Sequence, residues 1–342
     1  MSESGVRATT VIFNPAAGAG QAGRHRLILE QSFERWSAKP RIVETERPGH
    51  ATDLAREAAG RGDGMVIAAG GDGTAHEAIQ GLLDHAGPSA KQDSVEGSGE
   101  PGVGSDPGTG SGPPVFAYLP LGTGCDFAIA LNLTRDVAKL AAQLEHGENV
   151  RIDVGVAELS GPDGKTTRYF INAANIGLGP QVADHVRRSL WLRRWGKLAY
   201  VFATLIALPG ARPRPLIWRT DEGVEGERPV FHLSACNGPT FGGGLSPCPD
   251  ATLTSGRLHV AMGCDLSRLE VIRQMPRLMR GTRLDHPEIL SFSCHSLELS
   301  GADIRVETDG EVGGGLPARL SVRPGGLVVR VPRVADGRPH ES

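Results

Sequence analysis

Residues 65–79 read MVIAAGGDGTAHEAI, and this stretch decides how the N-terminal half of the chain folds. An apolar run long enough for one buried strand leads directly into a Gly-Gly-Asp-Gly-Thr turn at residues 70–74 and then into a helical pattern. Glycines let backbone N–H groups approach phosphate oxygens, and the following helix adds the positive end of its dipole. The turn therefore predicts a phosphate-binding site. The alternative is a plain β–α turn in which Thr74 caps the helix.

Asp72 narrows the kind of ligand that this turn would bind. A carboxylate inside the turn repels phosphate unless it fixes the loop, accepts a ribose hydroxyl or holds magnesium. The residue therefore points to a nucleotide that is bound together with a metal ion.

Strands and helices alternate on both sides of this stretch. The pattern predicts strands at residues 9–13, 41–44, 65–69 and 115–119, with helical segments at 21–36, 51–59, 75–84 and 122–131. This alternation predicts a parallel sheet with helices on both faces, and ligands bind such sheets at the carboxyl ends of the strands. Gly122, Thr123 and Asp126 follow the fourth strand, so we expect them at the same edge as Asp72. Capping of a helix explains Thr123 and Asp126 equally well.

A second glycine pattern near the N-terminus keeps a different function open. Gly18 begins a formal Gly-x-Gly-x-x-Gly, and Glu44 follows at about the distance that an NAD-binding fingerprint requires. Residues 14–17 separate the expected strand from the first glycine, however, and would displace the tight turn. An ordinary glycine-rich loop explains the pattern as well, and an NAD-dependent oxidoreductase is one alternative.

After residue 147 the sequence changes to alternating segments with few helices between them, which predicts a β-rich antiparallel domain. We place the α/β domain at residues 1–147, the second domain at 148–334 and a flexible tail at 335–342. Residues 87–114 lack aromatic residues and consist mainly of Gly, Pro and Ser, so we expect a disordered, linker-like insertion there. In the second domain, Asp309-Gly310-Glu311 suits a general base and is equally typical of a hairpin.

Composition excludes several classes of protein. With 39% hydrophobic and 22% charged residues among 342, the chain is neither disordered throughout, nor collagen-like, nor an integral membrane bundle. A net charge of −3 provides no overall field that favours nucleic acid. The five cysteines form no CxxC pair, which predicts free thiols in a reducing compartment. We expect a cytoplasmic protein that is soluble or at most peripheral to a membrane, because no apolar run reaches the ~18 residues of a spanning helix.

Taken in order, the motifs resemble one family, the diacylglycerol kinase catalytic-domain lipid kinases, which include bacterial diacylglycerol kinases and sphingosine and ceramide kinases. The resemblance covers nearly the whole chain, from Val11 to about Val331. The matching motifs are Asn14-Pro15 with Gly18, Thr45 with Gly49-His50-Ala51, the turn at 70–74 with Glu77, Gly122-Thr123 with Asp126-Phe127-Ala128, Gly242 to Gly244, and Asp309-Gly310-Glu311. NAD kinases and phosphofructokinases share a turn like that at 70–74, but the other motifs do not look like theirs.

The resemblance implies a phosphofructokinase- or NAD kinase-like α/β nucleotide domain, a β-rich lipid domain and an active site between them. It implies transfer of the γ-phosphoryl group of ATP, with Mg²⁺, to the hydroxyl of diacylglycerol or a related lipid. Glu311 matches the general base, and Asp72 lies near the metal and the phosphates. The residues implied for the ATP site are Asn14, Gly18, Thr45, Gly70, Gly71, Asp72, Gly73, Thr74, Glu77, Gly122, Thr123 and Asp126.

Two positions depart from the family pattern. Cys125 stands where the family usually has Asn. Ser255 stands where bacterial members commonly have an Asp that binds a structural magnesium together with two carbonyls, which here would be those of Thr252 and Arg257. A serine is a neutral and poorer ligand for Mg²⁺. These departures leave open a catalytically weak member of the fold that binds lipid or nucleotide.

Residues 186–214 predict how the chain would meet its lipid. The segment carries seven basic residues, no acidic residue, and many apolar and aromatic ones. Aromatic side chains at headgroup depth and cations facing anionic lipid are typical of an interfacial anchor, so we expect peripheral contact with the inner face of the membrane. A helix pair that packs on the core is the alternative. The identity of the lipid and the oligomeric state stay open, with a homodimer among the options.

Overall fold

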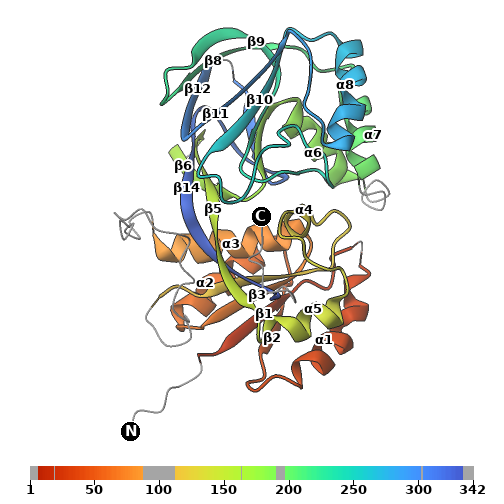
Figure 1. Ribbon diagram of the computed structural model, residues 1–342, viewed down its shortest axis with the longest axis vertical. Coiled ribbons are helices and arrows are strands. Elements are labelled where there is room, and N and C mark those ends of the chain that lie inside the picture. The colour runs from red at the N-terminus through yellow and green to blue at the C-terminus, as the bar shows by residue number, and fades with distance from the viewer. Residues whose placement is uncertain are drawn as a thin grey trace. The chain divides into compact units, whose positions relative to one another are not determined.

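The computed structural model describes residues 7–18, 20–87, 112–162, 164–189, 197–301 and 303–333, and they form two compact units (Figure 1). The first unit contains the residues up to 122, residues 133–151 and those from 327 onward, and the second contains 123–132 and 152–326. The chain therefore crosses between the units several times, not once at residue 147 as the sequence predicted. The reason is that the two long strands β5 and β14 each contribute residues to both units.

Two sequence predictions fall on residues outside this description. Of the insertion expected at 87–114, residues 88–111 lie outside the described ranges. The tail expected at 335–342 lies outside them entirely.

The first unit is built on a sheet whose neighbouring strands β4, β3, β1 and β2 pair in parallel in that order. The last residues of β14 extend it, with Val329 pairing in parallel with Phe116 of β4. Each of the four strands is within one residue of its prediction; β1, β3 and β4 are mostly buried runs, whereas β2 is short and partly exposed. Their bounds are β1 Thr9–Phe13, β2 Arg41–Glu44, β3 Met65–Gly70 and β4 Val115–Pro120.

Helices cover both faces of this sheet, with α2 and α3 on one face and α1 and α5 on the other (Figure 1). On the α1 and α5 side, Phe13, Ile67 and Leu119 join Phe33 and Leu140 in one buried cluster. The helix expected at 21–36 is shorter and begins with a 3-10 turn. The helices are η1 Ala22–His25, α1 Arg26–Phe33, α2 His50–Gly60, α3 Asp72–Ala86 and α5 Val137–Leu144.

The second unit is β-rich, as predicted, and its strands pair antiparallel. Strands β9, β7, β13, β14, β12 and β8 pair in a closed circuit that returns to β9, and side chains from these strands share one buried cluster. The bounds are β5 Glu148–Gly161, β6 Gly164–Phe170, β7 Ala173–Gly177, β8 Arg214–Thr220, β9 Glu225–Cys236, β10 Leu258–Cys264, β11 Ile289–Cys294, β12 Ser296–Gly301, β13 Arg305–Thr308 and β14 Glu311–Val331.

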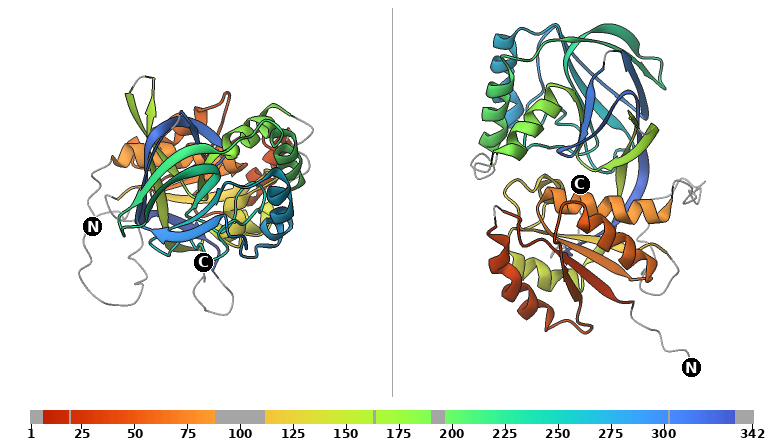
Figure 2. Two further views of the ribbon diagram at one scale, coloured as in Figure 1. Left: turned by 90° about the horizontal axis from the view of Figure 1, so that it is seen from above. Right: turned by 180° about the vertical axis from the view of Figure 1, so that it is seen from behind.

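Four helices accompany these strands, and three of them gather on one side of the unit (Figures 1 and 2). They are α6 Leu178–Arg188, α7 Lys197–Ala207 and α8 Arg268–Arg280, and the fourth is the short α4 Asp126–Ala130. Within the described residues, no helix has the length and apolar character needed to cross a bilayer.

The close packing of α2 on α3 gives a testable prediction. A side chain at Gly81 would bring its Cβ to 2.2 Å from the Thr52 carbonyl oxygen. We expect Gly81→Ala to lower the free energy of unfolding by about 1–3 kcal/mol, because the two helices must move apart. Urea unfolding followed by circular dichroism measures the change. In the control, Gly60→Ala, the nearest atom lies 3.9 Å away, so stability should be unchanged or slightly higher. Equal stability of both variants would contradict this account of the packing.

Candidate functional site

The predicted nucleotide-binding residues of the first unit gather at the carboxyl edge of its sheet. The first residue after each strand stands at this edge: Asn14 after β1, Thr45 after β2, Gly71 after β3 and Leu121 after β4. Backbone hydrogen bonds continue past the strands: Asn14 N donates to the Ala69 carbonyl at 2.9 Å, and Leu121 N to that of Gly70 at 2.7 Å. The sheet register therefore brings residues that are far apart in the sequence to one edge.

The turn at 70–74 forms the N-terminal end of α3. Gly71 is the N-cap, and its carbonyl accepts hydrogen bonds from Thr74 N at 3.0 Å and Ala75 N at 3.1 Å. The alternative reading of Thr74 as the cap was wrong. Its hydroxyl instead accepts a hydrogen bond from Asn14 Nδ2 at 2.9 Å.

The same turn has the features of a phosphate cradle. A Cβ at Gly70 would lie 2.4 Å from the hydroxyl oxygen of Thr74, so only glycine fits beneath that side chain. Around Gly73, by contrast, no heavy atom of the described residues lies within 4 Å of where a Cβ would be, apart from its chain neighbours and the backbone of its own helix. The first N–H groups of a helix point out of its N-terminal end, which carries a partial positive charge. The turn thus offers backbone donors, open space and the Asp72 carboxylate together.

Gly18 belongs to a turn that closes over the same edge. It has a φ of +58°, and a Cβ there would meet the Leu121 carbonyl oxygen at 2.8 Å. Asn14 Oδ1 begins this turn by accepting a hydrogen bond from Ala16 N at 3.0 Å. The glycine therefore stands at the end of a separate turn and not in the tight strand-to-helix turn of a dinucleotide fingerprint.

Glu77 supports the loop that leads into α2. Its carboxylate accepts hydrogen bonds from the backbone N–H groups of Gly49 at 2.9 Å and Ala51 at 3.2 Å, at the start of α2. Thr52 Oγ1 donates to the Glu77 carbonyl at 2.9 Å. The sequence placed Glu77 among the ATP-lining residues, whereas in the structure its carboxylate holds the loop that follows Thr45.

Gly122 closes the first unit, whereas Thr123 and Asp126 belong to the second. Asp126 is buried, and its Oδ2 accepts a hydrogen bond from Gly243 N at 2.6 Å. The carboxylate therefore anchors the predicted Gly242 to Gly244 motif, in which all three glycines have positive φ. Cys125 precedes it as a buried residue with φ 57° and ψ 50°, a conformation that Asn adopts more readily than Cys.

In the second unit, the predicted acidic motif is the hairpin turn between β13 and β14. Asp309 and Gly310 are its two central residues, with φ of 48° and 92°. The Asp309 carboxylate accepts backbone hydrogen bonds from Ile171 at 2.7 Å, Asn172 at 2.9 Å and Ala173 at 3.0 Å. Asp309 is thus a clamp that fixes the turn, and Glu311 stands exposed as the first residue of β14.

Sequence reasoning missed Glu307, two residues before the clamp. Its side chain is buried and accepts hydrogen bonds from Asn175 Nδ2 at 2.9 Å and from Gly310 N. Burial is the main cause that raises the pKa of Glu307 to about 7, with the charges of Asp309 and Glu311 adding to it. The sequence of β13 did not mark this residue, because the strand does not alternate between buried and exposed positions: Val306, Glu307 and Thr308 are all buried.

The residues considered for a structural magnesium do not fit that ion. The Ser255 hydroxyl donates to the Arg257 carbonyl at 3.1 Å, so one expected metal ligand is already bonded within the turn. Asp153 closes the same turn by accepting hydrogen bonds from Gly256 N at 2.6 Å and Gly325 N at 2.9 Å. Ser255 N also donates to the carbonyl of Thr252 at 3.3 Å. Hydrogen bonds therefore hold this turn closed.

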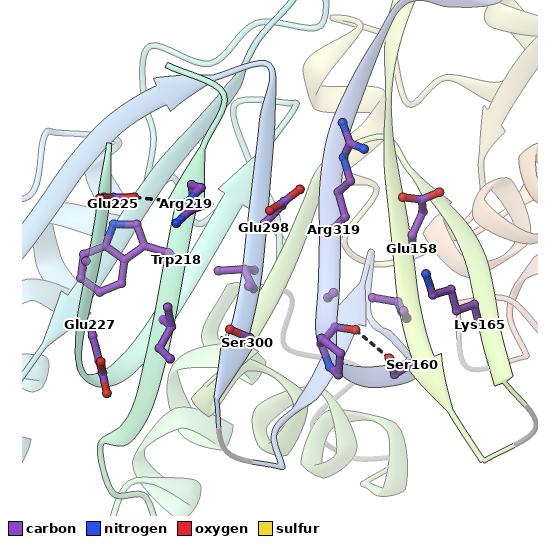
Figure 3. A pocket seen from close by; sticks show the side chains of 16 residues that line it. Glu158, Ser160, Lys165, Trp218, Arg219, Glu225, Glu227, Glu298, Ser300 and Arg319 are labelled. Atoms are coloured by element: carbon purple, nitrogen blue, oxygen red, sulfur yellow. Dashed lines mark hydrogen bonds and ion pairs between the residues drawn. The ribbon is translucent and has the colours of Figure 1, made fainter. Parts of the chain in front are cut away.

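A groove of about 790 Å³ lies elsewhere in the second unit, across β6, β5, β14, β12, β8 and β9 (Figure 3). Its charged side chains alternate in sign, and Arg219 pairs with Glu225 at 3.1 Å along its rim. None of the residues predicted for the site lines it. We therefore leave the groove outside the candidate site.

Comparisons with known proteins match both halves of the chain. Residues 8–157 match the family model described as diacylglycerol kinase catalytic domain, and residues 172–331 match that described as YegS C-terminal NAD kinase beta sandwich-like domain. The second description agrees with the expected β-rich second domain.

Individual relatives align over most of their length. The diacylglycerol kinase of Bacillus subtilis is 28% identical over 315 residues, which cover 91% of each chain. That of Staphylococcus haemolyticus is 27% identical over 312 residues, which cover 91% of this chain and 84% of the relative. The crystal structure of a diacylglycerol kinase from Bacillus anthracis has a TM-score of 0.64 at 19% identity, covers 96% of this chain and 98% of that chain, and shows the fold.

The role of Glu77 is tested by its removal. We expect Glu77→Ala to lower the free energy of unfolding by about 1–3 kcal/mol, because the N–H groups of Gly49 and Ala51 lose their acceptor. Thermal or urea unfolding measures the loss. In the control, Glu57→Ala, an exposed acid of α2 is removed, and the change should stay within about 0.5 kcal/mol. A Glu77→Ala protein as stable as the control would contradict the assigned role.

Proposed function

The chain belongs to the diacylglycerol kinase catalytic-domain family, and from this premise we propose that it is a kinase that transfers the γ-phosphoryl group of ATP to a lipid hydroxyl. Diacylglycerol is the acceptor that we propose first, because the curated relatives bear that name. The observation that carries the proposal is the glycine turn at residues 70–74, which opens α3 at the carboxyl edge of the sheet.

The nucleotide would bind at this edge in the first unit. The N-terminal end of α3 and the open space at Gly73 suit phosphate oxygens, and Asn14, Thr45 and Gly122 end the neighbouring strands. Mg²⁺ would accompany ATP as part of the substrate, with Asp72 as the carboxylate of this edge that suits a hard cation, and would neutralise charge on the phosphate oxygens. Thr123, which follows Gly122 in the chain, is also among the residues that we propose for the nucleotide site.

Glu311 is the residue that we propose as general base. It stands exposed at the start of β14, after a turn that the Asp309 clamp holds in place. Its carboxylate would take the proton of the lipid hydroxyl while that oxygen forms a bond to the γ-phosphorus and the bond to the leaving ADP oxygen breaks. Positioning and charge stabilisation supply most of the rate in such transfers.

The first experiment measures transfer of labelled γ-phosphate into organic-extractable product. Diacylglycerol, sphingosine, ceramide, undecaprenol and a total lipid extract are offered with Mg²⁺ and ATP. We expect Glu311→Ala to lower kcat by roughly 100-fold with little change in the KM for ATP, because a base acts in the transition state. In the matched control, Glu298→Ala removes an exposed acid of β12 and should leave kcat unchanged. Protection of the fold by ATP without transfer to any lipid would instead favour the non-catalytic binding protein.

We also propose a membrane-contact surface, which we name the α7–α8 surface. The segment expected to touch lipid, residues 186–214, is described at 186–189 and 197–214, whereas residues 190–196 lie outside the described ranges. On α7, exposed apolar side chains recur on one helix face, and α8 lies beside it (Figures 1 and 2). The surface consists of Leu198, Phe202, Leu205 and Ile206 of α7 and Leu269, Ile272, Arg273 and Arg280 of α8.

The composition of this surface suits an anionic bilayer. Leu269 is 55% exposed and Ile272 is 42% exposed, and together with the exposed apolar side chains of α7 they form a group of the kind that marks an interaction surface. Arg273 and Arg280 lie on the same exposed face of α8. Apolar side chains at headgroup depth with cations beside them are typical of helices that lie on a membrane.

Vesicle binding tests the α7–α8 surface. We expect the double substitution Leu269→Asp with Ile272→Asp to weaken binding to vesicles containing anionic lipid by tenfold or more, since each buried apolar side chain contributes on the order of 1.5–3 kcal/mol. Sedimentation with vesicles of anionic or of neutral lipid gives the affinity. Val224→Asp, at an exposed apolar position outside the surface, is the control and should bind as the wild type does. Equal binding of the double variant would reject this surface.

A further inference from the structure

A chain of buried polar side chains leads to the turn that precedes Glu311. His232 Nε2 lies 2.9 Å from Ser234 Oγ, which lies 2.7 Å from Asn175 Oδ1. Asn175 Nδ2 lies 2.9 Å from Glu307 Oε2, and Glu307 Oε1 accepts the N–H of Gly310. Asn175 and Ser234 are fully buried, and Glu307 is 4% exposed. The chain thus joins β9, β7 and β13 to the hairpin turn.

The proton positions along this chain follow from its chemistry. A carboxylate only accepts, so the amide of Asn175 must turn its N–H toward Glu307 and its oxygen toward Ser234. The single hydroxyl proton of Ser234 is then donated to Asn175. His232 must therefore donate from Nε2, and its buried Nδ1, which carries no proton in this arrangement, makes no hydrogen bond of normal geometry. A backbone interaction with Ile176 raises the pKa of the ring, against the larger effect of burial. While Glu307 is ionised, each hydrogen bond in this series is therefore donated toward Glu307.

We propose that Glu307 is a positioning residue for the base: held by Asn175, its carboxylate fixes the N–H of Gly310 and so sets the place from which Glu311 acts. This inference rests on the proposed function, because it takes Glu311 to be the base. The Asp309 clamp holds the other central residue of the same turn to the backbone at residues 171–173. Both residues of the turn are therefore fixed by a carboxylate.

Protonation of Glu307 would reverse the chain without breaking it. The new O–H would donate to Asn175 after its amide turns over, Asn175 would donate to Ser234, and Ser234 would donate to Nε2 of His232. The proton of the imidazole would then sit on Nδ1. Burial lowers the pKa of His232 to about 4, so its imidazole is neutral near pH 7. A change in the ring near that pH is therefore a change of tautomer and not of charge.

Other charged groups surround this chain in the described residues. Asp309 and Glu311 stand on the hairpin itself. Arg168 of β6 packs against Gly313 of β14, next to the hairpin. Asp184 of α6 pairs with Arg305 of β13 at 3.1 Å, and His185 follows it on α6.

Three variants of the full chain test the proposal. Glu307→Ala removes both hydrogen bonds, and we expect kcat to fall on the order of 100-fold while the KM for ATP stays within about twofold, because only the base is displaced. Glu307→Gln imitates the protonated form, keeps the acceptor for Gly310 and should retain kcat within about threefold. Asp153→Asn alters another buried carboxylate that accepts two backbone N–H groups, away from the hairpin, and should also retain kcat within about threefold.

Nitrogen-15 NMR of the imidazole gives a second readout that needs no substrate. We expect His232 to carry its proton on Nε2 in the wild type at pH 8 and on Nδ1 in Glu307→Gln at the same pH. In the wild type the tautomer should change as the pH falls through about 7, where Glu307 takes up its proton. This readout follows the hydrogen-bond chain alone and is independent of turnover.

The outcomes separate the inference from the proposed function. A folded Glu307→Ala protein with kcat within about threefold of the wild type overturns the positioning role. If Glu307→Ala does not fold, Glu307→Gln decides: a loss of more than tenfold in kcat together with the wild-type tautomer of His232 overturns it. The lipid phosphorylation assay tests the proposed function separately. That function fails if Glu311→Ala phosphorylates lipid as fast as the wild type, or if the wild type phosphorylates no lipid.

Discussion

A backbone N–H group that is buried without an acceptor costs about 1–3 kcal/mol, and acidic side chains remove that cost at the loops of this chain. A carboxylate is well suited to this work because its two oxygens accept several hydrogen bonds, each strengthened by charge. The glycine-rich turns then keep fixed shapes although they have few side chains to pack. The pairs are Glu77 with Gly49 and Ala51, Asp126 with Gly243, Asp153 with Gly256 and Gly325, Asp309 with residues 171–173, and Glu307 with Gly310.

The acids that hold these loops are different from the acids that we assign to the reaction. Glu77, Asp126 and Asp309 belong to motifs that a sequence comparison would mark as functional, and each holds a loop in place. Asp72 and Glu311 are the carboxylates to which we assign metal binding and proton transfer in our proposal. Substitution of a structural acid that holds a loop of the site would also lower activity, so loss of turnover alone does not identify a catalytic residue. Stability and the split between kcat and KM do.

The sequence was sufficient for the parallel strands and the glycine turn at residues 70–74, because buried apolar runs and turn glycines are local signals. It failed where long-range contacts decide. The single boundary expected at residue 147 ignored that β14 is long enough to enter both units. The sequence could not show that Glu77 holds the loop before α2, because the N–H groups that its carboxylate accepts lie 26 and 28 residues away in the chain. Glu307 was not predicted, because Asn175, which donates a hydrogen bond to its carboxylate, lies far away in the chain.

The pairing of Val329 with Phe116 also has a consequence for synthesis of the protein on the ribosome. The N-terminal unit cannot complete its sheet until the ribosome has made the strand that supplies Val329, and all of the second unit is translated first. Until then the outer edge of β4 is an unpaired, strongly apolar strand edge in the nascent chain. Such an edge is a binding site for chaperones and a starting point for aggregation. Non-local pairing of this kind also slows folding, so expression of this protein should depend on chaperone supply and translation rate.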